Sequence, residues 1–155
     1  MIELFDYLIE NKITVATAES CTGGNISAEF VAYPGISEIF VAGLCTYHNS
    51  AKENILGVKS ETLKNFGAVS EECAREMLLG ARKNTGAMAS VCTTGIAGPG
   101  GGTDKKPVGL VYVGASYKDK TEVVKCNFSG TRSEVIEQAK NYALNLLYKV
   151  IMGGN

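Results

Sequence analysis

The sequence has little of what several classes of protein require. It contains one histidine, His48, so neither a histidine-rich metal site nor a pair of acid/base histidines is available. No apolar run approaches the roughly 20 residues that cross a bilayer, and the N-terminus is acidic and amphipathic rather than signal-like. We therefore expect a cytoplasmic protein with no metal, no cofactor and no membrane partner.

The net charge and the cysteine pattern exclude further classes of protein. The formal net charge is −1, so the chain offers no clustered Lys and Arg surface, and nucleic acid is not an expected partner. The five cysteines are an odd number, sit mostly inside apolar runs and never form a C-x-x-C pair. We expect them to be reduced residues of the core.

The chain length and the apolar periodicity predict the architecture. The 155 residues suffice for one well-filled core and are too few for two domains, so we predict a single domain over residues 1–155. Helical spacing predicts helices over 2–9, from Gly24 to before Pro34, from Ser50, over 70–86, and from Thr131 onward. Strands are predicted over 13–18, 39–47, 87–93, 108–117 and 121–128, the last two as a hairpin.

Helices that alternate with apolar strands favour an α/β fold. We predict a three-layer α/β/α sandwich whose mixed, mostly parallel sheet contains an antiparallel hairpin. In such folds ligands collect at the carboxyl ends of the strands. The segments at Ser20 and Thr94 both follow predicted strands, so we expect them to share one cleft.

The turn after the first predicted strand carries a candidate nucleophile. Ser20 precedes Thr22, Gly23 and Gly24, and a strand end there would expose its hydroxyl next to backbone N–H groups that can cradle an oxyanion. The alternative is that Ser20 or Thr22 caps the following helix. Cys21 is a rival nucleophile, but with no histidine nearby in sequence we expect a buried structural thiol.

Lys52 is the candidate base. Ser50 and Glu53 match a capping box, which places Lys52 in the first turn of a helix, where the dipole lowers the pKa of a cation. An exposed surface lysine is the alternative. Tyr47 ends the preceding strand, where it can relay a proton or serve as a half-buried strand aromatic.

A glycine-rich loop over residues 94–102 offers backbone N–H groups to a phosphate or a carboxamide, and Thr94 adds a hydroxyl. The loop matches neither the P-loop pattern nor the dinucleotide fingerprint, so binding of ATP or NAD through those motifs is unsupported. Arg132 lies at a predicted helix start, where a guanidinium favours a phosphate, and solvated surface charge is the alternative.

Six segments together resemble one known family. They are TAESCTGG at 17–24, TYHNSAK at 46–52, GAVS at 67–70, TGIAGPGGG at 94–102, KPVG at 106–109 and FSGTR at 128–132. In order and spacing they are similar to the CinA C-terminal domain family over nearly the whole chain. Many relatives have Ser and Glu where this chain has His48 and Ser50, and we expect these two positions not to be essential.

The resemblance implies both the activity and the site. It implies an amidase that converts nicotinamide mononucleotide and water to nicotinate mononucleotide and ammonia, in pyridine nucleotide recycling, on a mixed-sheet α/β/α fold. It implies that Ser20 is the nucleophile and that Tyr47 and Lys52 are its catalytic companions. The implied substrate-binding residues are Cys21, Thr22, Gly23, Gly24, Thr94, Gly95, Gly98, Gly100, Gly101 and Arg132.

The sequence is also compatible with other functions. The pocket can belong to a nucleotide-binding or regulatory module without turnover, or to an amidase for another small amide. Longer relatives carry a further N-terminal domain, and we expect this chain to be the stand-alone amidase form. A homo-oligomer is compatible with a chain this small, which can complete its cleft from a neighbour.

Overall fold

The computed structural model describes residues 1–153, and the last two residues of the predicted domain, 154 and 155, lie outside the described part. The elements, in chain order, are α1 (Ile2–Glu10), β1 (Val15–Glu19), α2 (Asn25–Val31), the 3-10 helix η1 (Ile36–Glu38), β2 (Phe40–Cys45), α3 (Asn49–Leu56), α4 (Ser60–Asn65), α5 (Glu71–Thr85), β3 (Ala89–Gly95), β4 (Leu110–Tyr117), β5 (Lys120–Asn127) and α6 (Arg132–Met152).

The five strands form one sheet in the order β2-β1-β3-β4-β5. β1 pairs in parallel with β2 and β3, whereas β4 pairs antiparallel with both β3 and β5. Four strands therefore run in one direction and β4 alone opposes them. This confirms the predicted mixed, mostly parallel sheet and its antiparallel hairpin.

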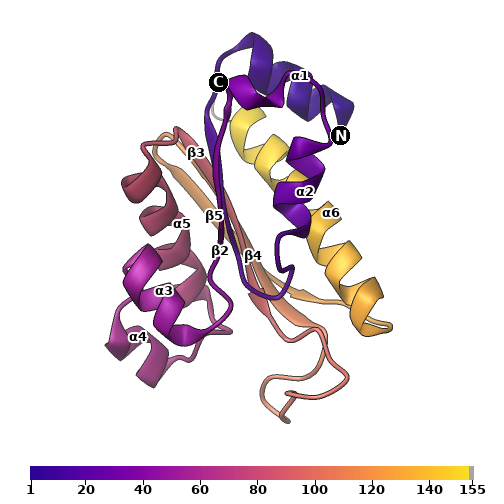
Figure 1. Cartoon of the computed structure of the whole chain (residues 1–155). Coiled ribbons are helices and arrows are strands. Elements are labelled where there is room, and N and C mark those ends of the chain that lie inside the picture. The colour runs from indigo at the N-terminus through magenta and orange to yellow at the C-terminus, as the bar shows by residue number, and fades with distance from the viewer. Residues whose placement is uncertain (154–155) are drawn as a thin grey trace.

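Helices cover both faces of this sheet (Figure 1). α1, α2 and α6 lie on one side, and α3, α4 and α5 lie on the other. A large apolar cluster fills the space between the sheet and the first group, and a smaller cluster lies under α5. Every residue of β1 is buried, as expected for a strand in the middle layer of the predicted three-layer sandwich.

Two predicted helix starts are present as expected. The Ser70 hydroxyl accepts a hydrogen bond from the N–H of Cys73 and caps α5. Thr131 and Glu134 exchange both bonds of a capping box at the start of α6. α5 also ends as predicted, at Gly86, whose φ of 73° is a left-handed conformation that glycine adopts without strain.

The predicted capping box at Ser50 is wrong. α3 begins at Asn49, and its N-cap is His48, whose ring Nδ1 accepts a hydrogen bond from the N–H of Ser50. The helix therefore starts earlier than the hydroxyl pattern indicated, because an imidazole nitrogen takes the role of the capping oxygen. Lys52 consequently lies deeper in the helix than predicted.

The expectation that all cysteines lie in the core is wrong for Cys45, which is exposed. β2 is an edge strand with alternating exposed residues, and Cys45 is on its exposed face. The other four cysteines are buried: Cys21, Cys73, Cys92 and Cys126.

The topology brings three chain segments to one edge of the sheet. β1, β2 and β3 are parallel and end at Glu19, Cys45 and Gly95, so the segments that follow these residues meet at the carboxyl edge. In Figure 1 the long loop between β3 and β4 extends beyond the sheet at that edge. Within residues 1–153, no helix is both long enough and apolar enough to span a membrane.

Candidate active site

Ser20 and Lys52 form a buried pair at the carboxyl edge of the sheet. Ser20 directly follows β1, and its N–H donates to the Thr93 carbonyl of β3. Lys52 projects from α3, and its Nζ lies 3.0 Å from the Ser20 Oγ. Only 1% of Lys52 is exposed, so the alternative of a surface lysine is wrong.

Burial lowers the pKa of Lys52 from its ordinary value of 10.5, because the buried site solvates an ammonium poorly. The direction matches the sequence prediction, but desolvation rather than the helix dipole is the main cause. Among the described residues, no carboxylate forms an ion pair with Lys52 that would raise its pKa again.

The hydrogen bonds of Lys52 suit a neutral amine that acts as a base. Nζ also lies 2.6 Å from the carbonyl oxygen of Thr46 and 3.2 Å from that of Tyr47. A neutral amine has two N–H donors and one lone pair. Nζ can donate to the Ser20 Oγ and to both carbonyls when it is charged; when the amine is neutral, its two donors go to Thr46 and Tyr47, because carbonyl oxygens only accept, and its lone pair remains for the Ser20 hydroxyl.

Cys21 is buried beside this pair, as predicted. Burial raises the pKa of its thiol to about 11, so the thiol is neutral near pH 7. A neutral thiol is a poor nucleophile, whereas the Ser20 hydroxyl has a base within hydrogen-bond distance. The geometry thus favours Ser20 over Cys21.

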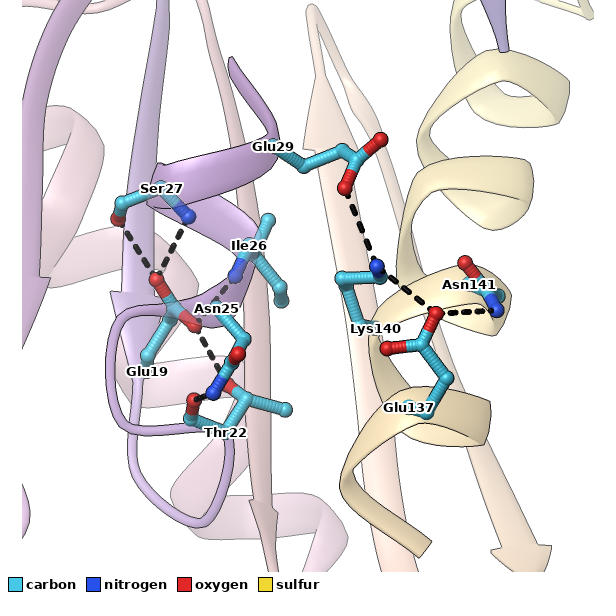
Figure 2. Close-up of polar contacts among 9 residues, drawn as sticks. All are labelled: Glu19, Thr22, Asn25, Ile26, Ser27, Glu29, Glu137, Lys140 and Asn141. Atoms are coloured by element: carbon cyan, nitrogen blue, oxygen red, sulfur yellow. Dashed lines mark hydrogen bonds and ion pairs between the residues drawn. The ribbon is translucent and has the colours of Figure 1, made fainter. Parts of the chain in front are cut away.

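A buried carboxylate occupies the inside of the turn that follows Ser20 (Figure 2). Glu19 Oε1 accepts hydrogen bonds from the Thr22 hydroxyl and the N–H groups of Gly24 and Ile26. Glu19 Oε2 accepts from the N–H and the hydroxyl of Ser27. The first N–H groups of α2 are therefore satisfied from within the chain.

This carboxylate changes the expected role of the turn. The N–H of Gly24 points at Glu19 and that of Gly23 donates to the Ser20 carbonyl, so neither is available for the predicted oxyanion cradle. The N-cap of α2 is Gly24, so neither Ser20 nor Thr22 caps this helix. Sequence reasoning missed Glu19, although a carboxylate at the end of a buried strand is itself an unusual feature.

A cavity of about 270 Å³ opens beside Ser20 and Lys52. It brings together most of the predicted site, and its lining includes Ser20, Cys21, Tyr47, Lys52, Thr94, Gly95, Gly98, Gly100, Gly101 and Arg132. Thr22, Gly23 and Gly24 are not part of the lining. Ile96 and Ala97 also line the cavity and belong to the predicted loop over residues 94–102, whereas Asn49, Ala68 and Val69 were not predicted to line it.

Tyr47 and Arg132 meet at the cavity. The Arg132 guanidinium donates to the Tyr47 hydroxyl at 2.9 Å and to the Gly98 carbonyl at 2.8 Å, so it joins α6 to the glycine-rich loop. Tyr47 lies beyond the end of β2 and is 61% exposed, so the alternative of a half-buried strand aromatic is wrong. Its carbonyl contacts Lys52, while its hydroxyl contacts the guanidinium.

Thr94 closes the opposite wall. It is buried in β3, and its hydroxyl donates to the Ala68 carbonyl at 2.8 Å, which ties the segment before α5 to the sheet. The charged side chains that line the cavity are Lys52 and Arg132, both cationic. Within residues 1–153, no three His, Cys, Asp or Glu side chains gather in a group that could hold a metal ion.

Comparisons with known proteins identify the family of this chain. The model of the CinA C-terminal domain matches residues 2–151. A CinA-like protein from Endomicrobium trichonymphae is 52% identical over 145 residues, which are 94% of this chain and 34% of that protein. The chain thus spans about a third of the length of the curated relatives it matches.

Solved structures share the fold over nearly the whole chain. Competence damage-inducible protein A from Klebsiella pneumoniae superposes with a TM-score of 0.95 at 35% identity, over 99% of this chain and 96% of that one. Competence/damage inducible protein CihA from Agrobacterium tumefaciens gives a TM-score of 0.91 at 37% identity, over 96% of this chain and 94% of that one. The chain belongs to the CinA C-terminal domain family.

Proposed function

We propose that this chain is an amidase that hydrolyses nicotinamide mononucleotide to nicotinate mononucleotide and ammonia. The observation that carries the proposal is the buried contact of 3.0 Å between Lys52 Nζ and Ser20 Oγ. A lysine without a carboxylate partner, held against a serine hydroxyl beside a cavity, fits nucleophilic catalysis. The resemblance described above supplies the substrate.

The reaction needs one nucleophile and one base. Neutral Lys52 takes the proton of the Ser20 hydroxyl while Oγ forms a bond to the carboxamide carbon. The tetrahedral intermediate collapses, the C–N bond breaks, and protonated Lys52 returns its proton to the departing ammonia. A water molecule, deprotonated by Lys52, then attacks the ester carbon; the bond to Ser20 Oγ breaks, protonated Lys52 returns its proton to Oγ, and the acid product ionises to the carboxylate.

The tetrahedral oxyanion needs donors that Glu19 has not already taken. Cys21 is the one residue of the turn after Ser20 that lines the cavity, so we expect its backbone N–H to face the oxyanion. Loss of one such donor costs roughly 100-fold or more in turnover in other acyl-transfer enzymes.

The electrostatics of the cavity support an anionic substrate. Its two charged lining residues, Lys52 and Arg132, are cations. Because Lys52 is committed to Ser20, Arg132 is the group that suits a phosphate, which a guanidinium binds with two parallel hydrogen bonds. The Tyr47 hydroxyl accepts a hydrogen bond from this guanidinium, and the Tyr47 carbonyl accepts one from Lys52. We therefore assign Tyr47 the role of orienting both side chains.

The test is ammonia release from nicotinamide mononucleotide without added metal. We expect turnover by the wild-type chain and a loss of at least about 1,000-fold in Ser20→Ala and in Lys52→Met, since members of a nucleophile and base pair act as a unit. Lys64→Met is the matched control, because Lys64 is an exposed lysine on α4. Near-normal turnover by Ser20→Ala would refute the mechanism.

Two other outcomes would change the assignment. Tight binding of the nucleotide by wild type without ammonia release would indicate a binding or regulatory module instead of an enzyme. Equal turnover of nicotinamide riboside, which lacks the phosphate, would indicate an amidase for unphosphorylated amides.

A further inference from the structure

We propose that Glu19 is a positioning residue for Ser20. Its carboxylate holds the turn over residues 20–24 from the inside and so fixes the Ser20 hydroxyl against Lys52. This inference rests on the proposed function only in taking Ser20 as the nucleophile, and it names a residue that does not itself line the cavity.

The burial and the partners of Glu19 set it apart from an ordinary surface carboxylate. The side chain is fully buried, and its two oxygens accept five hydrogen bonds, three at Oε1 and two at Oε2. Three of the donors are backbone N–H groups at the start of α2, where the helix dipole also favours a negative charge. These contacts offset the cost of burying the carboxylate without a cationic partner.

Two chains of hydroxyl groups extend these contacts, one to Thr93 on β3 and the other to Thr17 on β1. The single hydroxyl hydrogen of Thr22 goes to Glu19, so in the 2.8 Å contact between Thr22 and Thr93 the Thr93 hydroxyl is the donor. By the same reasoning the Thr17 hydroxyl donates to Ser27, which donates to Glu19. An amide in place of the carboxylate has one acceptor oxygen instead of two, so at most one of the two chains keeps its acceptor.

The first chain ends next to the nucleophile. Thr93 is the residue whose carbonyl accepts the N–H of Ser20. Glu19 therefore acts on Ser20 from two sides, through the peptide bond that joins them and through Thr22 and Thr93. A displacement of about 1 Å in a reacting group can cost about 100-fold in rate, so a looser turn is expected to lower turnover.

The variant that tests this most directly is Glu19→Gln, which keeps the shape of the side chain. If the amide oxygen faces the three donors of Oε1, the amide nitrogen meets the N–H of Ser27, and two donors then oppose each other. We expect kcat for nicotinamide mononucleotide to fall at least about tenfold while KM stays within about twofold, since Glu19 does not contact the cavity.

The matched control lies on α2, the helix whose first N–H groups donate to Glu19. Glu29, on α2, points away from Glu19 and pairs with Lys140 of α6 (Figure 2). Glu29→Gln makes the same chemical change at a partly exposed carboxylate, and Lys140 keeps its partner Glu137. We expect wild-type kcat from this variant.

A second pair of variants keeps the proposal testable should Glu19→Gln not fold. Thr22→Val removes the hydroxyl that joins Glu19 to Thr93, whereas Thr22→Ser retains it. We expect Thr22→Val to lower kcat and Thr22→Ser to restore it. Rescue by serine separates a positioning effect from a loss of packing.

A substrate-independent measurement separates this inference from the proposed function. The rate at which phenylmethylsulfonyl fluoride modifies Ser20, followed by mass spectrometry, reports the activation of the serine alone. Slower labelling in Glu19→Gln than in Glu29→Gln supports the inference even if wild type releases no ammonia from nicotinamide mononucleotide, in which case only the proposed substrate fails. Wild-type labelling and kcat in Glu19→Gln, or losses that merely track its folded fraction, would overturn the positioning role. A wild-type chain that neither turns over nor labels would overturn both proposals.

Discussion

The buried amine of Lys52 has a measurable consequence for stability. In the unfolded chain Lys52 titrates near its ordinary pKa of 10.5, whereas burial lowers the pKa in the folded chain. Between these two pKa values the unfolded state binds more protons than the folded state, so the free energy of unfolding rises with pH. Below both values the ammonium is present in each state, and the full cost of burying it destabilises the folded chain.

The magnitude follows from the size of the shift. Each unit by which burial lowers the pKa of Lys52 changes the free energy of unfolding by about 1.4 kcal/mol. For a chain of this length, about 1 kcal/mol corresponds to roughly 2–4 °C in Tm. Lys52→Met removes the titrating group, so the Tm of wild type is expected to rise relative to that of Lys52→Met as the pH increases toward 10.5.

The assay is thermal unfolding of both proteins between about pH 7 and 10.5. Burial raises the pKa of the Cys21 and Cys73 thiols to about 11, which lowers stability above their ordinary pKa of 9.0. Both proteins contain these thiols, so the difference in Tm between wild type and Lys52→Met removes their common contribution and leaves that of the lysine together with its electrostatic coupling to them. A difference that stays flat or falls with pH would refute the reasoning, and the exposed-lysine variant Lys64→Met is expected to show no trend.

Three further predictions concern the surroundings of the pair. Arg132→Met should raise KM for nicotinamide mononucleotide by at least about tenfold, since a hydrogen bond to a charged group contributes about 1.5–3 kcal/mol. The same variant should leave KM for the riboside unchanged. Equal effects on both substrates would exclude Arg132 as the phosphate site. Iodoacetamide near pH 8 should label Cys45 first, because it is the exposed cysteine, and mass spectrometry showing equal labelling of a buried one would contradict the burial. Gly80→Ala should lower both Tm and kcat, because a Cβ there would lie 1.8 Å from the Leu56 carbonyl at the end of the helix that carries Lys52. Gly86→Ala, with open space around its Cβ, should cost about 1–2 kcal/mol of stability with kcat retained, and a normal kcat in Gly80→Ala would argue against that coupling.

Local sequence signals predicted the fold where the physical cause was itself local. Ser70 and Thr131 begin their helices as predicted because the capping bonds form within one turn of the chain. The start of α3 is also set by a local capping bond, but it was mispredicted because His48 is not among the usual capping residues. The short helices η1 and α4 carried too few residues for a periodic pattern.

The sequence motifs predicted candidate residues of the site but not the contacts between them. Ser20 and Lys52 were identified from their segments, but the distance between them depends on how α3 packs against the end of β1, which no local pattern encodes. Ala68 and Val69 enter the cavity wall because Thr94 binds the Ala68 carbonyl, a contact between segments that are 26 residues apart. Such contacts follow from tertiary packing.

The hydrogen bonds of Glu19 indicate which end of the cavity can bind the phosphate of a substrate. The start of α2 is a place where an anion would otherwise bind, and the chain supplies that anion itself. An external phosphate would have to displace a buried carboxylate that accepts five hydrogen bonds. Within residues 1–153, by contrast, the Arg132 guanidinium donates hydrogen bonds only to the Tyr47 hydroxyl and the Gly98 carbonyl. The phosphate of a substrate is therefore expected at the Arg132 end of the cavity, which leaves the Ser20 end for the uncharged carboxamide.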